Sequence, residues 1–466
     1  MRKLILLSAL LICSIGVCFG QLVAKVDERI ELTGVVFRLA QIPEYTQGTI
    51  DQYNEAIDKY FYDYRYDPVI EYVIKLRNEY GLGYSAVAGS TLALSIENGH
   101  VIQSPCFLKS ELPDLGSKWK DDETFEKYVE LLDDFYVKSN FRKFFDEHQE
   151  LYSEIEAGIN ELLIDFNGKW FTDFFGVEFQ CPAVYVCAGN GPSNYYIVDY
   201  ESNTDYAILL GGRQHYSYEY TLPTIIHEIC HNYSNPLFYK YSNQMEPAAK
   251  KIYEDVKEEM LNNAYGSWSD TAREWQNNLC TAMYLRDNMP LIKNFWIGEL
   301  RDRGFIWLPR SVQFAENFYA NREKYPHFDS FMPQLVSFLN YTADDYERIK
   351  FEFENQYPYI VSVFPANNSN IKGCNFSEIR VTFSQPMSPY AYSVGVVKDD
   401  ASFSRIPRSE TIDAYWVDNY TFVIPIEPSL IENDKKYGIL LGRRGFGTLV
   451  SSKMKEDYII TYKTCE

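Results

Sequence analysis

Residues 221–237 read TLPTIIHEICHNYSNPL and contain an HExxH motif, in which two histidines are four positions apart and a glutamate follows the first. Thr221 is expected to cap a helix, and Pro236 is expected to end it. His227 and His231 then lie one turn apart on the same face, with Cβ atoms about 5–6 Å apart, so both imidazoles can bind one metal ion.

Glu228 follows His227 directly and is rotated by about 100° around the helix. It can therefore reach a metal-bound water without being a ligand, which is the position of a general base. Cys230 lies at a different angle from both histidines and is expected to pack in the core. Three isoleucines are expected to form an apolar wall around the site: Ile225, Ile226 and Ile229.

The motif is improbable by chance. The chain has six histidines and 65 acidic residues among 466 positions, so the expected number of random HExxH matches is roughly 0.01. A pair of structural core histidines is the alternative. The rarity of the pattern favours a metal site.

A catalytic zinc site has three protein ligands and keeps one position for water. The motif does not continue with a third histidine, so a later helix is expected to supply the third ligand. The candidates are Glu246, Glu254, Glu258, Glu259 and Glu274. The first four belong to an acidic run that is typical of a solvated helix face. Glu274 lies among apolar and aromatic residues and is favoured, with Glu258 as the second choice.

The composition is that of a folded protein, with 46% hydrophobic and 16% aromatic residues. The formal charge is -21, which repels phosphate backbones and anionic lipid headgroups. Nucleic acid is therefore not expected as a partner.

Residues 1–20 have a basic start, an apolar run and a small residue at the end, which is typical of a secretory signal peptide. The mature chain is expected to begin near Gln21 and to be secreted, periplasmic or at the cell surface. No later stretch reaches the roughly 18 to 20 apolar residues of a spanning helix, so no transmembrane segment is expected. Cys18, near the end of this segment, is a candidate site for lipid attachment, so the sequence leaves open whether the chain has a lipid anchor.

Apolar spacing predicts helices over residues 28–98 and 121–166, then strands over 176–211 that lead into the motif. Helical spacing resumes after the motif. The last part of the chain is rich in short β-like stretches separated by turn residues. We therefore expect an α+β fold: a mainly helical region over 21–355, followed by an all-β sandwich over 356–466.

Seven cysteines remain after the signal peptide, so at least one thiol is free or pairs between molecules. Cys181 with Cys187 and Cys374 with Cys465 are possible pairs. The sequence alone determines neither.

The stretches VDERIELTGVVFRLA, IIHEICHNYSNP and AYGSW resemble a family of secreted bacterial proteins that is catalogued as a domain of unknown function with a zincin-type HExxH motif. The similarity runs over about residues 26–350. It implies a zincin-like fold and a gluzincin set, with His227, His231 and Glu274 as zinc ligands and Glu228 as the catalytic residue. This chain departs from the pattern of that family at Asn278 and Leu279, where relatives tend to have an Arg-Ala pair.

The C-terminal run IRVTFSQPM resembles bacterial Ig-like domains over about residues 357–466. Such modules position an attached enzyme. The resemblance also makes this region a candidate for association with a cell surface or a glycan.

Four residues near the motif are candidate donors to an oxyanion: His215, Tyr216, Tyr218 and Tyr233. The strand DYAILLGG, residues 205–212, is either a sheet edge that pairs with an extended peptide or an ordinary core strand.

The sequence thus predicts a secreted zinc metallohydrolase, a metallopeptidase acting on protein or peptide substrates. One alternative is a non-catalytic surface or adhesion protein that retains a structural zinc. Another is a hydrolase of a different amide or ester, because HExxH determines the metal chemistry and says little about the substrate.

Overall fold

The computed structural model describes residues 22–104, 118–191, 193–198, 206–355, 357–374, 376–397, 402–448 and 453–464. The predicted signal peptide, residues 1–20, lies outside the described residues. The chain forms two compact units. The first comprises the described parts of Met1–Asn243, Arg273–Pro290 and Ala315–Gln334, and the second those of Gln244–Ala272, Leu291–Phe314 and Leu335–Glu466.

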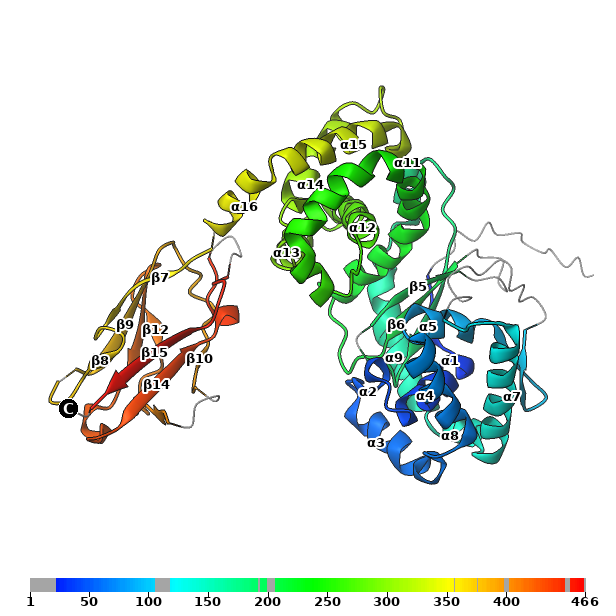
Figure 1. The fold of residues 1–466 in the computed structure, drawn as a ribbon, viewed down its shortest axis with the longest axis horizontal. Coiled ribbons are helices and arrows are strands. Elements are labelled where there is room, and N and C mark those ends of the chain that lie inside the picture. The colour runs from blue at the N-terminus through cyan, green and yellow to red at the C-terminus, as the bar shows by residue number, and fades with distance from the viewer. Residues whose placement is uncertain are drawn as a thin grey trace, which may run out of the picture. The chain divides into compact units, whose positions relative to one another are not determined.

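The N-terminal part of the first unit is mainly helical, as its apolar spacing predicts (Figure 1). Its helices are α1 (Glu28–Leu39), α2 (Pro43–Thr46), α3 (Asp51–Tyr60), α4 (Pro68–Tyr80), α5 (Ser85–Thr91), α7 (Asp122–Lys138), α8 (Phe141–Glu147), α9 (Gln149–Leu162) and α10 (Gly168–Phe175).

The end of the stretch predicted to be helical is instead an antiparallel hairpin of β2 (Leu94–Glu97) and β3 (His100–Gln103). Asn98 and Gly99 connect the strands with φ values of 52° and 81°. An Asn-Gly pair adopts such left-handed conformations readily and favours a two-residue hairpin turn, which explains the difference.

A four-stranded sheet positions the HExxH segment. Its order is β1 (Ala24–Val26), β4 (Ala183–Cys187), β6 (Tyr206–Gly211) and β5 (Tyr195–Val198). The first three strands are parallel, and β5 pairs antiparallel with β6. All six residues of β6 are buried, in keeping with an interior strand. In Figure 1, α1 and α5 lie beside this sheet.

Helix α11 (Thr221–Asn262) carries the motif and differs from the prediction at both ends. Thr221 is its first residue rather than its cap, because the first helical backbone bond runs from the N–H of Thr224 to the oxygen of Tyr220, which puts Tyr220 at the cap position. The helix also continues through Pro236. An internal proline costs about 3 kcal/mol or more, but Phe238 and Met245 beyond it are fully buried, which offsets the loss.

Helical structure continues in α12 (Trp268–Asn288), α13 (Pro290–Asp302), α14 (Leu308–Ala320), α15 (Phe328–Asp344) and α16 (Tyr346–Glu354). No helix among the described residues is long and apolar enough to cross a membrane.

The rest of the chain forms short strands (Figure 1): β7 (Ile360–Phe364), β8 (Ser369–Asn370), β9 (Glu378–Phe383), β10 (Val394–Gly395), β11 (Ser404–Arg405), β12 (Tyr415–Trp416), β13 (Thr421–Pro425), β14 (Lys436–Leu441) and β15 (Tyr458–Lys463). One sheet has the order β12-β13-β9-β7. The other has β10-β14-β15-β8, with β11 beside β14. Ile379 and Phe422 from the first sheet share one apolar core with Ile439 and Ile460 from the second. The chain is thus of mixed α and β structure, as predicted.

Cys181 and Cys187, named as a possible pair, do not form a disulfide with each other. Cys187 is a buried free thiol whose Sγ contacts the backbone oxygen of Ile30 at 3.8 Å. The pairing of Cys374 with Cys465 is untested, because Cys465 lies outside the described residues.

Candidate metal centre

Three side chains with metal-binding atoms meet between α11 and α12, within the first unit. His227 and His231 lie on α11, and Glu274 lies on α12. Glu274 Oε2 is 3.4 Å from His227 Nε2, and Glu274 Oε1 is 3.6 Å from His231 Nε2. The structure therefore brings together the three residues that the sequence singled out as metal ligands.

The spacing of these atoms fits a zinc ion. Two ligands at a tetrahedral angle lie about 3.3 Å apart, because zinc bonds to nitrogen and oxygen are about 2.0–2.2 Å long. Both histidine–glutamate separations are close to this value, and the ligand atoms of all three residues lie within 4.8 Å of one another. In the described part of the chain, no other group of three or more His, Cys, Asp or Glu side chains meets in this way.

Two asparagines orient the histidines. Asn235 Oδ1 lies 3.1 Å from His231 Nδ1 and favours a proton there, which leaves the Nε2 lone pair available as a ligand. Asn277 Nδ2 donates to the backbone oxygen of His227 over 3.0 Å and lies 3.1 Å from the Nδ1 atom of the same residue. Asn277 is held in turn by Ser234, whose hydroxyl donates to its Oδ1 over 2.6 Å.

Burial and charge give His231 and Glu274 the protonation states that zinc binds. Burial lowers the pKa of His231 to about 4, so this imidazole is neutral near pH 7. Burial alone raises the pKa of Glu274, but His231 and His227 outweigh it and hold the pKa of this carboxyl below its usual range. Neutral imidazoles and an ionised carboxylate are the forms that coordinate a metal.

Glu228 lies beside this cluster and is only 8% exposed. Burial raises the pKa of Glu228 to about 7. His227 lowers it in part, the charge on Glu274 raises it further, and a hydrogen bond from the backbone N–H of Tyr196 lowers it. Tyr196 belongs to β5, so the edge strand of the sheet reaches the glutamate of the motif.

Ile225, Ile226 and Ile229, which were expected to form an apolar wall, are all fully buried. Cys230 is also fully buried and packs in the core, as expected, and burial raises the pKa of its thiol. The burial of these side chains anchors this part of α11 in the protein interior.

The other candidate ligands lie elsewhere. Glu254, Glu258 and Glu259 are exposed on the later part of α11, and Glu246 forms an ion pair with Lys250 over 2.7 Å. The solvated helix face predicted for this run is confirmed. Asn278 is 1% exposed and so is closed to a substrate that arrives from solvent.

The candidate oxyanion donors are dispersed. His215 and Tyr218 are exposed on the loop before α11. Tyr233 is buried, and its hydroxyl accepts the N–H of Gln180. Tyr216 accepts the backbone N–H of Arg213 in a small pocket. The strand within 205–212 is interior, since β6 pairs with β4 on one side and β5 on the other.

Sequence reasoning missed Asn235, Asn277 and Tyr196. Asn235 follows His231 by four residues and Asn277 follows Glu274 by three, so helical spacing puts each asparagine on the same face as its neighbour in the cluster. That spacing was a usable signal. The role of Tyr196 depends on how β5 packs against α11, and no local sequence pattern predicts that packing.

The chain was compared with family models, curated proteins and solved structures. No family model and no curated protein matches it. Among solved structures, a crystal structure of the S-layer protein rSbsC has 15% sequence identity and a TM-score of 0.16, and the match covers 51% of this chain and 33% of that one. A crystal structure of the N-terminal part of the bacterial S-layer protein SbsC has 12% identity and a TM-score of 0.15, and that match covers 48% and 55%.

The chain thus spans about a third and about a half of these two proteins. At such TM-scores the likeness carries no argument about the fold of this chain. The zincin and Ig-like resemblances stay predictions.

Proposed function

We propose that the chain is a secreted zinc-dependent metallohydrolase that cleaves peptides. The observation that carries this proposal is the convergence of His227, His231 and Glu274 with a buried glutamate, Glu228, at their side. A site that only holds a structural zinc has no need of a second acid that is not a ligand beside the metal.

The donor set defines the chemistry. His227, His231 and Glu274 would hold the ion through two imidazole nitrogens and one carboxylate. Bound zinc supplies a Lewis acid and a water of lowered pKa. Glu228 accepts the proton of the attacking water at its carboxylate and passes it to the leaving amine.

The edge strand favours an extended peptide as substrate. Within the described residues, β5 pairs on one side only, with β6. The N–H of Tyr196 is directed at Glu228, so the side of β5 away from β6 faces the candidate centre. A peptide that adds to this edge would have its backbone held beside the glutamate.

The remaining parts of the proposal come from the sequence. The signal peptide directs the chain out of the cytoplasm, where the enzyme is secreted, periplasmic or held at the cell surface. The C-terminal strands form an Ig-like module that positions the enzyme, and this module is the candidate contact to a surface or a glycan.

The test combines zinc content, measured by elemental analysis, with cleavage of a peptide library followed by mass spectrometry. Wild type is expected to bind one zinc per chain, His231→Ala to lose it and Glu274→Ala to bind it weakly. Glu228→Gln is expected to keep its zinc but to lose at least about 100-fold in cleavage rate. A chain that binds no zinc after reconstitution contradicts the proposal. A zinc-loaded Glu228→Gln variant that behaves like wild type would indicate the non-catalytic surface protein instead.

A further inference from the structure

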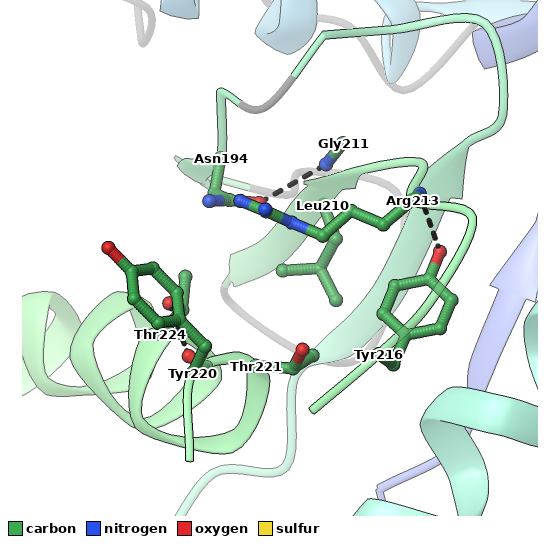
Figure 2. A pocket seen from close by; sticks show the side chains of 8 residues that line it. All are labelled: Asn194, Leu210, Gly211, Arg213, Tyr216, Tyr220, Thr221 and Thr224. Carbon is green, nitrogen blue, oxygen red and sulfur yellow. Dashed lines mark hydrogen bonds between the residues drawn. The ribbon is translucent and has the colours of Figure 1, made fainter. Parts of the chain in front are cut away.

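A small pocket lies where the end of β6, the start of β5 and the first turn of α11 meet (Figure 2). Its free interior volume is about 10 Å³, which is room for about one water-sized group. This size suits one oxygen of a functional group that belongs to a larger molecule, rather than a whole small ligand. Its lining residues are Asn194, Leu210, Gly211, Arg213, Tyr216, Tyr220, Thr221 and Thr224.

The pocket has a positive charge and no negative one. Arg213 is the one charged residue in its lining, and Figure 2 shows this side chain stretched across the pocket towards Asn194. In the described part of the chain, no carboxylate forms an ion pair with its guanidinium. The guanidinium lies 6.0 Å from the ring centre of Tyr220, which leaves its N–H groups available to an anion.

Two threonine hydroxyls face the same space. The Thr221 side chain is nine-tenths buried, and no hydrogen bond to its hydroxyl is found among the described residues. The Thr224 hydroxyl donates to the backbone oxygen of Tyr220 over 2.8 Å and keeps its lone pairs. The start of α11 adds the positive end of a helix dipole. The pocket therefore offers an anion a guanidinium, two hydroxyls and the positive end of a helix dipole.

The pocket and the candidate centre share a helix and a strand. Thr221 and Thr224 precede Glu228 by seven and four residues, which places them on its face of α11, about 6 to 10 Å earlier along the axis. Asn194 directly precedes β5, whose Tyr196 contacts Glu228. An extended peptide advances about 3.3 Å per residue, so this span corresponds to about two to three residues.

We propose that the Arg213 pocket binds a carboxylate of the peptide substrate, about two to three residues from the cleaved bond. The inference rests on the proposed peptidase function and adds a substrate class to it. The carboxylate belongs either to an aspartate or glutamate side chain or to the C-terminus of the peptide. In both cases the guanidinium and the hydroxyls supply charge-assisted hydrogen bonds.

The first arm of the test measures cleavage. Fluorogenic peptides carry glutamate or glutamine at each position around the cleaved bond, and each is made with a free or an amidated C-terminus. We expect wild type to prefer the carboxylate at one position on one side of the bond. In Arg213→Gln, the ratio of kcat/KM between the glutamate and glutamine peptides is expected to fall about 10- to 100-fold, through a higher KM.

Matched variants control this arm. Arg213→Lys keeps the charge without the planar fork, so an intermediate ratio is expected. Arg444→Gln removes an exposed arginine of the second unit and is expected to leave the ratio unchanged. A preference for glutamate over glutamine at one position identifies a side-chain carboxylate. A preference for a free over an amidated C-terminus identifies the terminal carboxylate.

The second arm measures binding without cleavage, by fluorescence anisotropy of labelled acidic and amidated peptides with the zinc-loaded Glu228→Gln chain. Cleavage with an equal acidic preference in wild type and Arg213→Gln overturns the pocket assignment alone. Absence of cleavage, together with acid-selective binding that Arg213→Gln removes, overturns the peptidase function and supports the pocket. Binding that ignores the carboxylate in wild type overturns the pocket whatever the first arm shows.

Discussion

Asn277 Nδ2 donates a hydrogen bond to the backbone oxygen of His227 over 3.0 Å, and this contact joins α12 to the first histidine of the motif. The same nitrogen lies 3.1 Å from the ring Nδ1 atom, so one amide restrains both the backbone and the imidazole. Glu274 lies one turn earlier on α12. The position of the glutamate relative to the histidines therefore depends on this link.

Asn277→Leu removes the link while keeping a side chain of similar size. We expect zinc affinity to fall about 10- to 100-fold, as for other residues that orient metal ligands. Competition with a chromophoric chelator measures the affinity. Asn262→Leu, at the exposed end of α11, is the matched control and is expected to bind zinc like wild type. Equal affinities for both variants would show that Asn277 has no orienting role.

Zinc removal is expected to lower the stability of the first unit. A ligand that binds only the folded state contributes about 2.7 kcal/mol when its free concentration is 100 times its Kd. Chemical denaturation with zinc and with a chelator measures the difference. His231→Ala lacks one donor, so its stability is expected to be the same under both conditions. A chelator effect of equal size in His231→Ala would place the bound metal elsewhere.

The local part of the candidate site was predictable. The HExxH spacing places His227 and His231 on one helical face whatever the rest of the fold does. The apolar surroundings of Glu274 correctly indicated a buried carboxylate, which must be paired or bound. The contact of Tyr196 with Glu228 was not predictable, because it depends on how an edge strand approaches a helix from a distant part of the chain.

The errors have a common physical origin. Pro236 was expected to end α11 because local propensity disfavours an internal proline, but the buried side chains beyond it outweigh that cost. The spacing of Cys181 and Cys187 left a disulfide between them possible. In the structure Cys187 packs under α1 instead, where Gly34 leaves room for its sulfur. Both cases are decided by tertiary packing, which single-sequence patterns do not report.

Glu31 is expected to make stability depend on pH. It is buried beneath the sheet, where burial raises its pKa from 4.5 to about 7 although Tyr53 and the N–H groups of Ala188 and Gly189 donate to it. A raised pKa means that the folded state binds the proton more tightly. The stabilisation is complete below pH 4.5 and is lost as pH rises to about 7, a change of about 3 kcal/mol.

The measurement is the free energy of unfolding of wild type and Glu31→Gln between pH 5 and pH 8. The stability of wild type relative to the variant is expected to fall across this range by most of that amount. Glu55→Gln, an exposed change on α3, serves as the control for the background titration. A constant difference between wild type and Glu31→Gln would mean that the carboxyl does not titrate there.

Gly34 and Cys187 are expected to be energetically coupled, because a Cβ atom at Gly34 would lie 2.7 Å from Cys187 Sγ. Gly34→Ala therefore overpacks the contact between α1 and β4, and we expect it to cost about 1–3 kcal/mol. In a Cys187→Ala background the sulfur is gone, so the same change is expected to cost less or to stabilise α1 by up to about 1 kcal/mol. A double-mutant cycle in urea measures the coupling, expected at about 0.5–3 kcal/mol. Additive effects would show that the helix and strand move apart freely, and that Gly34 does not set the packing that places Glu31 against Ala188.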